Sequence, residues 1–275
     1  MGRGDRPQWQ LPPGVPRGVW EYAQAEEIAL DYDEHFRGSQ LFQLDEQVLG
    51  EYFCRPGLVI DLGCGTGRAL VPLARRAMRC VGVDLSRPML GVLGRKQAEE
   101  NLPILRIQVN LVELDCIRDE AADYCMCLFS TLGMVRGRGN RDRVLGHAQR
   151  ILKPGGLFVV HVHNTWNRIF DAAGRRWLAG NLLQSLLKRD VELGDRFFDE
   201  RGAAKLFVHT FSRRELTVGL RRAGFDLLRL IPLAAASQRP LRWPWLLGRL
   251  RATGWIAVCR KRPPVKKPTT PAILN

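Results

Sequence analysis

A glycine-rich loop directly follows a short apolar segment in the first third of the chain. Residues 58–62 (LVIDL) are apolar with β-branched members, and the glycines Gly63, Gly65 and Gly67 come next. Glycine adopts positive φ angles and allows a ligand to approach the main chain closely. The amides at the start of a following helix point toward such a ligand. This loop therefore predicts a binding site for a nucleotide-like molecule.

An acidic residue stands at the end of the next predicted strand. Asp84 follows Gly67 by 17 residues. A carboxylate at this place can accept hydrogen bonds from both hydroxyls of a ribose. Asp84 alone would also suit a dinucleotide, but dinucleotide-binding folds have a third glycine where this sequence has Arg68. The spacing of the loop thus differs from the dinucleotide class.

Apolar segments of strand length alternate with helical periodicity through the middle of the chain. Strands are predicted at 58–62, 80–84, 104–109, 122–129 and 157–162, with helices at 68–78, from 86 onward and at 140–152. Strand, helix and strand at this spacing are typical of βαβ units, which build a parallel sheet with helices on both faces. Ligands of such sheets bind beyond the carboxyl ends of the strands, where the glycine loop and Asp84 would lie.

The flanking segments differ in composition from this core. The start is rich in Gly, Pro and Arg, and a helical periodicity follows it. After the fifth strand the βαβ pattern stops. Residues 205–210 suit a strand or an extended segment, and two further strands are predicted at 225–231 and 254–260. The predicted boundaries are 1–18 for a flexible arm, 19–57 for an N-terminal helical lid, 58–260 for the main domain with an insert at 165–204, and 261–275 for a disordered basic tail.

Cysteine usage and hydropathy place the protein in a broad class. The 7 cysteines include no CxxC pair, and no His pair has zinc-finger spacing, so no metal is expected. They are typical of reduced thiols in a cytoplasmic protein. No transmembrane segment is expected, because no run approaches the roughly 18 apolar residues that a membrane span needs. The sequence indicates no oligomeric state.

The net charge of +14 is concentrated in the C-terminal part of the chain. Residues 161–275 carry 22 cations and 8 acids. Such a field favours nucleic acid, a phosphorylated substrate or an anionic lipid, although heavy Arg usage can also reflect genome composition. Trp243 and Trp245 lie among arginines here, which suits stacking on bases or an anionic surface. The alternative is that both Trp side chains cover the edge of the sheet.

Three motifs together resemble the class I S-adenosylmethionine-dependent methyltransferases. They are DLGCGTG at 61–67, VDLS at 83–86 with Met89 and Leu90, and LKPGG at 152–156. The resemblance extends over about residues 19–260. It implies an α/β fold with a doubly wound, mostly parallel seven-stranded sheet of the Rossmann-like methyltransferase type, whose last strand is antiparallel. An N-terminal helical lid and inserts after strands five and six would complete the fold.

The same resemblance implies S-adenosyl-L-methionine as the cofactor and assigns residues to it. Asp61 and Gly63 would hold the methionine part, Asp84 the ribose hydroxyls, and Leu85 would lie near the adenine. Asn110 stands where the family often has an acid. The implied cofactor-binding residues are Tyr32, Asp61, Gly63, Cys64, Gly65, Gly67, Asp84, Leu85, Met89, Asn110, Leu111 and Phe129.

The sequence identifies the residues that would bind the methyl acceptor less specifically than those for the cofactor. His163, at the end of strand five, is a candidate general base or a structural histidine, and Ser130 and Asn164 are candidate substrate residues. In-line transfer from a sulfonium mainly requires alignment of the nucleophile and exclusion of water, with a base only for a protonated acceptor. We expect a methyltransferase for a small-molecule acceptor. An RNA (tRNA) methyltransferase and a non-catalytic S-adenosylmethionine-binding protein are the alternatives.

Overall fold

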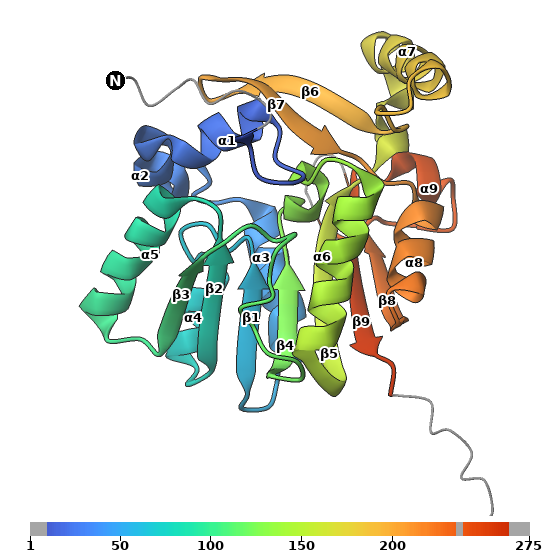
Figure 1. The fold of residues 1–275 in the computed structure, drawn as a ribbon. Coiled ribbons are helices and arrows are strands. Elements are labelled where there is room, and N and C mark those ends of the chain that lie inside the picture. Colours follow the sequence, from blue (N-terminus) through green and yellow to red (C-terminus); the bar gives the residue numbers. More distant parts are fainter. Residues whose placement is uncertain (1–9, 235–238, 264–275) are drawn as a thin grey trace, which may run out of the picture.

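A seven-stranded sheet forms the centre of the molecule (Figure 1). The structure is a computed structural model, and it describes residues 10–234 and 239–263. The strand order is β3-β2-β1-β4-β5-β9-β8, in which β9 runs antiparallel to β5 and β8 while the other neighbours are parallel. The strands are β1 Leu58–Leu62, β2 Arg79–Asp84, β3 Ile104–Gln108, β4 Ala122–Cys127, β5 Leu152–His163, β8 Phe225–Pro232 and β9 Gly254–Lys261. The predicted fold class is confirmed, including its antiparallel last strand.

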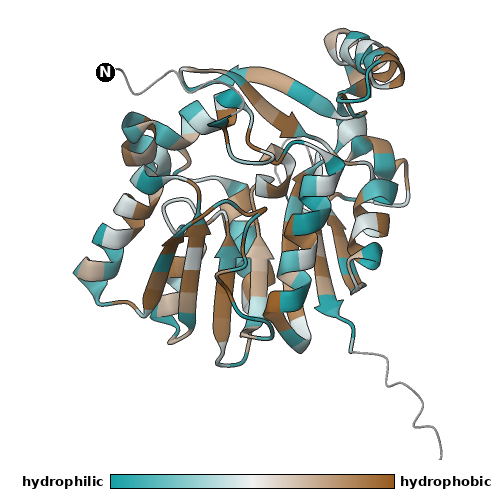
Figure 2. Cartoon of the chain, in the orientation of Figure 1, coloured by the Kyte–Doolittle hydropathy of each residue, from teal (hydrophilic) through white to brown (hydrophobic). Residues whose placement is uncertain are grey.

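Helices cover both faces of this sheet. Side chains alternate along β1, so Ile60 and Leu62 pack with α6 and α8, whereas Val59 packs with α3, α4 and α5. Figure 2 shows apolar residues concentrated on the strands. The helices are α3 Gln40–Tyr52, α4 Leu70–Arg75, α5 Arg87–Glu100, α6 Arg138–Ile151 and α8 Arg213–Arg222. Two serine side chains cap helix starts: Ser86 accepts from the Met89 amide and Ser212 from the Glu215 amide.

Two N-terminal helices lie at the carboxyl ends of the parallel strands (Figure 1). They are α1, Arg17–Gln24, and α2, Glu26–His35. Helix α1 packs Val19 on the strand β7, Ala203–His209, and α2 packs on α5. The described part of the predicted arm is also packed, because the Gly14 carbonyl accepts a hydrogen bond from the Arg136 amide at 2.8 Å. Residues 1–9 of that arm lie outside the described residues.

The insert after β5 builds a second small sheet. It contains the 3₁₀ helix η3 (Thr165–Phe170), helix α7 (Ala172–Leu187) and strand β6 (Asp195–Glu200), which pairs antiparallel with β7 (Ala203–His209). The prediction for 165–204 contained no strand. β6 is defined by its pairing with β7, which no local pattern of the sequence signals. This hairpin extends over the carboxyl ends of the central strands (Figure 1).

Two short helices complete the chain. They are the 3₁₀ helix η2, Thr131–Met134, after β4, and α9, Gly248–Arg251, between β8 and β9. No helix in the described ranges is both long and apolar enough to cross a membrane. The predicted disordered tail falls mostly on residues 264–275, which lie outside those ranges.

Candidate functional site

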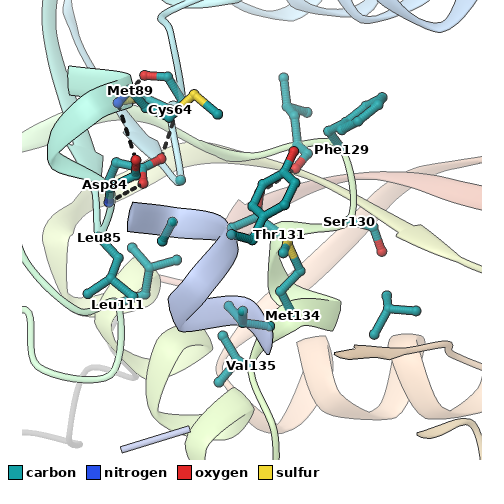
Figure 3. A pocket seen from close by; sticks show the side chains of 18 of the residues that line it. Cys64, Asp84, Leu85, Met89, Leu111, Phe129, Ser130, Thr131, Met134 and Val135 are labelled. Carbon is teal, nitrogen blue, oxygen red and sulfur yellow. Dashed lines mark hydrogen bonds between the residues drawn. The ribbon is translucent and has the colours of Figure 1, made fainter. Parts of the chain in front are cut away.

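A cavity of about 360 Å³ lies at the carboxyl ends of the parallel strands. Its walls come from the glycine loop after β1, the ends of β2 and β5, and the loops after β3 and β4. Helix α1 and the β6–β7 hairpin cover part of it from above. Figure 3 shows Asp84 and Leu85 on one side of this space and Phe129 and Ser130 on the other. The cavity therefore lies where a ligand of a doubly wound sheet is expected.

Asp84 is fixed by main-chain amides at the edge of the cavity. One carboxylate oxygen accepts from the Gly65 amide at 2.7 Å and the other from the Ser86 amide at 2.8 Å (Figure 3). Burial raises the pKa of Asp84, and the hydrogen bonds from these amides oppose that rise. The carboxylate thereby joins the glycine loop to the start of α5. Its unused lone pairs are available to a ligand hydroxyl.

Asp61 is a buried carboxyl with unused hydrogen-bonding capacity. Its side chain is 3% exposed and lines the cavity. The Oδ1 atom has no hydrogen-bond partner among the described residues. Burial raises the pKa of Asp61 to about 8, although the nearby Arg68 opposes this rise. A buried unpaired carboxyl is costly, so this side chain is suited to a ligand that brings a cationic donor.

The three glycines of the loop serve different purposes. All have positive φ, but a Cβ atom at Gly63 would collide with Thr131 and one at Gly67 with Leu93. At Gly65 the same atom would meet no described atom within 4 Å, and Gly65 lines the cavity. Gly65 therefore leaves space for a ligand. Gly63 also lines the cavity, but its missing Cβ, like that of Gly67, allows the loop to pack. Gly67, predicted as a cofactor residue, lies behind the loop and outside the cavity lining.

Polar contacts tie the N-terminal helices to the glycine loop. The Thr66 hydroxyl donates to Asp33 of α2 at 2.7 Å, and Lys96 of α5 forms an ion pair with the same Asp33. Arg68 donates to the buried Asp45 of α3 at 2.8 Å. Arg68 thus has a structural partner at the position where dinucleotide-binding folds have glycine. These contacts hold the helices over the site.

The other residues predicted for the cofactor also line the cavity. They are Tyr32, Cys64, Leu85, Met89, Asn110, Leu111 and Phe129. Asn110 donates to the Pro13 carbonyl at 2.9 Å and accepts from the Val112 amide, so it also fixes the segment before α1. Burial raises the pKa of the Cys64 thiol well above its usual value. Cys64 is thus a packed, protonated thiol and no nucleophile.

His163 and Ser130 face the cavity from adjacent strand ends. The Ser130 hydroxyl accepts from the His163 amide at 3.3 Å. The His163 side chain is exposed at the cavity, where desolvation by the surrounding walls and the charge of Arg196 on β6 together lower the pKa of its imidazole to about 4. The ring is therefore neutral at pH 7 and can accept a proton. His163 and Ser130 line the cavity as predicted, but their chemical roles stay predictions.

Asn164 lies elsewhere, contrary to its predicted place at the substrate. Its amide donates to the carbonyls of Arg249 and Ala252 at 2.9 and 2.6 Å, and its oxygen accepts from the Trp166 amide. The whole side-chain amide is therefore used to join η3 to the connection between β8 and β9. Asn164 is a structural residue outside the cavity lining.

The upper wall of the cavity consists of residues that the sequence did not indicate. It comes from α1, η2 and the hairpin, and it is almost entirely apolar. Its members include Val19, Tyr22, Met134, Phe198, Glu200, Leu206, Phe207 and Val208. The apolar run at 206–208 is an ordinary strand signal, and β7 lies there, but this run does not reveal which surface the strand covers. Only the folded position of the hairpin assigns these side chains to the site.

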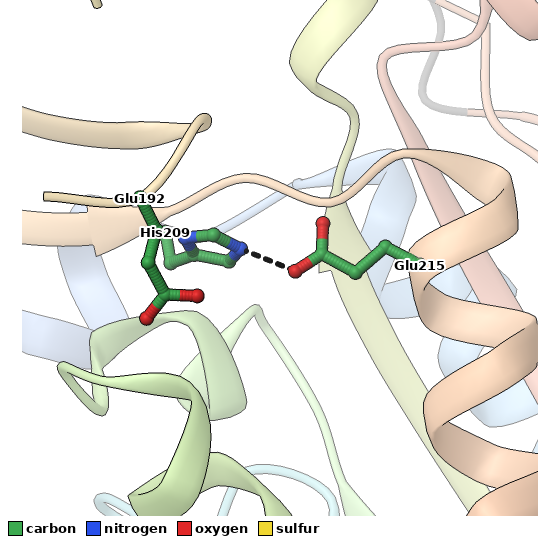
Figure 4. Close-up of side chains that lie close together, drawn as sticks. All are labelled: Glu192, His209 and Glu215. Atoms are coloured by element: carbon green, nitrogen blue, oxygen red, sulfur yellow. Dashed lines mark hydrogen bonds and ion pairs between the residues drawn. The ribbon is translucent and has the colours of Figure 1, made fainter. Parts of the chain in front are cut away.

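A buried ionic cluster fixes the hairpin to the main domain. His209 of β7 makes a hydrogen bond to Asp195 at 2.7 Å. Figure 4 shows its second bond, to Glu215 of α8 at 2.9 Å. Burial disfavours the charged imidazole, but these two carboxylates outweigh burial and raise the pKa of His209. Glu192, His209 and Glu215 have the spacing of metal ligands. However, the buried Arg141 already donates to Glu192 at 2.8 Å, so protein cations neutralise this cluster.

Comparisons with known proteins agree with this geometry. Residues 59–156 match the family model described as "Methyltransferase domain". A protein of Geobacillus sp. named as a methyltransferase is 30% identical over 118 residues, which cover 42% of this chain and 47% of that protein. A tRNA N(3)-methylcytidine methyltransferase of Drosophila melanogaster is 24% identical over 213 residues, 72% of this chain and 58% of that protein. The chain thus spans about half the length of these relatives.

A solved structure shows the same fold over most of the chain. The 1,6-didemethyltoxoflavin-N1-methyltransferase of Burkholderia thailandensis, solved with 1,6-didemethyltoxoflavin and S-adenosylhomocysteine bound, aligns with a TM-score of 0.61. The alignment covers 92% of this chain and 93% of that one, at 16% sequence identity. The similarity therefore includes the helices and the insert that surround the central sheet.

Proposed function

We propose that this protein transfers a methyl group to a small molecule. Its residues 59–156 belong to the class I S-adenosylmethionine-dependent methyltransferase family. The observation that carries this proposal is the covered, partly open cavity. Helix α1 and the β6–β7 hairpin cover the space beside His163 with apolar side chains. A covered, mostly apolar space with a few polar groups is typical of a small-molecule site.

The cofactor end of the cavity fits S-adenosylmethionine. The unpaired, buried Asp61 oxygen would take the ammonium of the methionine part, and Asp84 would take the ribose hydroxyls. The open side of Gly65 gives the cofactor access to the main chain. When bound, the cofactor supplies a methyl group on a sulfonium, which is already activated for transfer.

The protein's own contribution to the reaction is orientation, exclusion of water and acceptance of a proton. The apolar wall above the cavity excludes water from the transferred group. The neutral imidazole of His163 would accept the proton of a hydroxyl or amine acceptor, and the Ser130 hydroxyl is bound to the main-chain amide of the same residue. This assignment makes His163 the general base of the proposed reaction.

An RNA acceptor is the second candidate. It is supported by the tRNA methyltransferase relative and by the excess of 14 cations in residues 161–275. A base in RNA would have to enter beside the hairpin that covers part of the cavity, which disfavours this candidate. The third candidate, a cofactor-binding protein without catalysis, would keep the Asp61 and Asp84 geometry but transfer no methyl group.

Calorimetry tests the cofactor assignment. We expect S-adenosylmethionine and S-adenosylhomocysteine to bind and NAD not to bind. Since the pKa of Asp61 is about 8 before binding, this carboxyl is mostly protonated at pH 7. Pairing with an ammonium requires the ionised form, so binding should release close to one proton and tighten as pH rises from 6 to 8. Heats measured in two buffers of different ionisation enthalpy give the proton count.

Labelled cofactor tests the acceptor class. The purified protein is incubated with methyl-labelled S-adenosylmethionine and a cell extract separated into RNA, protein and small-molecule fractions. We expect label in the small-molecule fraction. Label confined to RNA would move the assignment to the second candidate. If calorimetry shows binding and no fraction takes label, the third candidate is favoured.

Asp84→Ala should weaken the binding of S-adenosylhomocysteine by about 1.5–3 kcal/mol, because it removes charge-assisted hydrogen bonds to the ligand. The variant should stay folded, since Asp84 stands at a strand end and its lost partners are main-chain amides. Glu99→Ala, at an exposed acid of α5, is the control and should bind as the parent does. Parental affinity in a folded Asp84→Ala variant would remove Asp84 from the site.

A cytoplasmic location is part of the same proposal. All seven cysteines are free thiols, and five of them are buried in the core. Free thiols persist in reducing compartments and pair in oxidising ones. The state of these cysteines therefore supports a cytoplasmic protein.

A further inference from the structure

We propose that one surface of this protein docks on an anionic lipid membrane. The surface is formed by η3, helix α7 and residues 239–251, and we call it the Leu–Trp surface. Among the described residues, 14 large apolar side chains are exposed, and 9 of them lie here. They are Phe170, Leu182, Leu183, Leu186, Leu187, Trp243, Trp245, Leu246 and Leu247. Apolar side chains gathered in this way on a protein surface mark a site of interaction.

Helix α7 directs four of its leucines away from the protein. Its buried residues are Gly174, Leu178 and Asn181. At about 100° per residue, Leu182, Leu183, Leu186 and Leu187 fall on the opposite side of the helix, within an arc of about 140°. In Figure 1 this helix projects from the body of the molecule, and Figure 2 shows apolar colour along it. The outward face of α7 therefore has no partner within the described chain.

The Trp-containing segment extends the same surface. The helix η3 contacts both α7 and α9, so it connects the two regions. Trp243 is 56% exposed and Trp245 is 79% exposed. The Arg242 guanidinium lies 5.2 Å from the ring centroid of Trp243. Trp rings with an apolar body and a polar N–H are enriched at membrane–water interfaces.

The charges around these side chains identify the partner. Residues 165–190 and 239–251 together contain nine cations and only two acids. The exposed cations are Arg175, Arg176, Lys188, Arg189, Arg239, Arg242 and Arg249. A surface that combines leucine, tryptophan and basic side chains binds at the boundary between headgroups and acyl chains of anionic membranes. Anionic headgroups would neutralise the cations while the apolar side chains enter the acyl region.

Two other occupants fit these observations less well. A second copy of this chain would bring the same cations face to face, which opposes association. Single-stranded RNA would satisfy the arginines and stack on the tryptophans, but it offers nothing to four leucines on α7. The inference goes beyond the proposed function, because membrane binding requires neither the cofactor nor methyl transfer.

Vesicle sedimentation of the full chain tests this inference. At 100 mM salt, we expect at least ten-fold stronger partition to vesicles of phosphatidylcholine and phosphatidylserine (70:30) than to phosphatidylcholine alone. Leu183→Gln/Leu187→Gln and Trp243→Ser/Trp245→Ser should each reduce partition more than five-fold. Arg239→Gln should reduce it up to about five-fold, the usual contribution of one cation near such a surface.

A matched control separates this surface from general hydrophobicity. Leu105 of β3 is 70% exposed and lies outside the Leu–Trp surface, so Leu105→Gln should partition as the parent does. Unchanged calorimetric affinity for S-adenosylhomocysteine shows that each variant is folded. Equal partition of the parent to both vesicle types would overturn the proposal, as would parental partition of folded Leu183→Gln/Leu187→Gln.

Two further measurements distinguish the other occupants. In sedimentation equilibrium we expect a species whose mass is the same for the parent and Leu183→Gln/Leu187→Gln. A parental dimer that this variant dissociates would assign the surface to a second copy and overturn the proposal. Fluorescence anisotropy with a 20-nucleotide oligouridylate should show binding that Trp243→Ser/Trp245→Ser does not change. Tight RNA binding that this variant abolishes would overturn the proposal in favour of RNA.

Discussion

Gly65→Val should lower the affinity for S-adenosylmethionine more than 100-fold and leave the protein folded. No described atom lies within 4 Å of the position where a Cβ would stand, and Gly65 lines the cavity. A branched side chain would therefore occupy space that the ligand needs, without colliding with the protein. Calorimetry with S-adenosylmethionine and S-adenosylhomocysteine measures the loss of affinity.

A side chain at position 65 also costs folding stability, because of the backbone conformation there. This effect needs its own control. The φ of +53° at Gly65 is in the left-handed region, where a side chain costs roughly 1–2 kcal/mol of stability. Gly155 has a φ of +76° and equally open surroundings, but it lies outside the cavity lining. Gly155→Val should therefore lose similar stability and keep parental affinity. If folded Gly65→Val also binds as the parent does, the loop does not approach the cofactor.

Gly63→Ala should behave in the opposite way. The Cβ of the new alanine would collide with the Thr131 side chain. The main effect of the substitution should therefore be a lower melting temperature and not a loss of ligand affinity. The two glycines are separated by one residue, and both have positive φ. Only their surroundings distinguish a position that serves the ligand from one that serves packing.

The central fold and the cofactor end of the site could be predicted because their signals are local. A short β-branched run followed by glycines predicts a strand and loop, and 58–62 is β1 in the structure. Parallel strands bring their carboxyl ends to one edge, which places the glycine loop beside Asp84. The Gly65 amide indeed donates to Asp84 at 2.7 Å.

The wall above the cavity could not be predicted because it depends on contacts between distant residues. β6 is held by its pairing with β7 and by Asp195, whose carboxylate bonds His209. Nothing in the composition of residues 195–200 distinguishes this strand from a polar loop. The same limitation explains Asn164, whose partners Arg249 and Ala252 are more than 80 residues away.

Backbone conformation explains a smaller difference after β4. The sequence predicts a strand over 122–129, but β4 ends at Cys127. Phe129 and Ser130 both have positive φ, at +53° and +63°. Such angles are uncommon for residues other than glycine and persist where the surroundings require them, often at functional sites. This turn places Phe129 and Ser130 at the cavity. Neither the secondary-structure propensity nor the hydropathy of these residues predicts such a turn.

His163→Gln should reduce the turnover number for methyl transfer by about 10²–10⁴-fold, the usual contribution of a general base. The affinity for S-adenosylmethionine should stay unchanged, because the proposed reaction assigns this side chain to the acceptor and not to the cofactor. The measurement is single-turnover transfer to the acceptor found by fractionation. The substitution His35→Gln, at an exposed histidine of α2, is the control and should keep parental turnover.

The pH dependence gives this assignment a second, independent test. The pKa of His163 is about 4, so the base stays unprotonated and transfer should not decline as pH falls from 8 to 5.5. The decline should come only as pH approaches 4. Arg196→Gln removes a positive charge that holds this pKa down, and it should therefore move the decline to higher pH. A decline already near 6.5 in the parent, or turnover within two-fold of the parent in His163→Gln, would show that His163 is not the base.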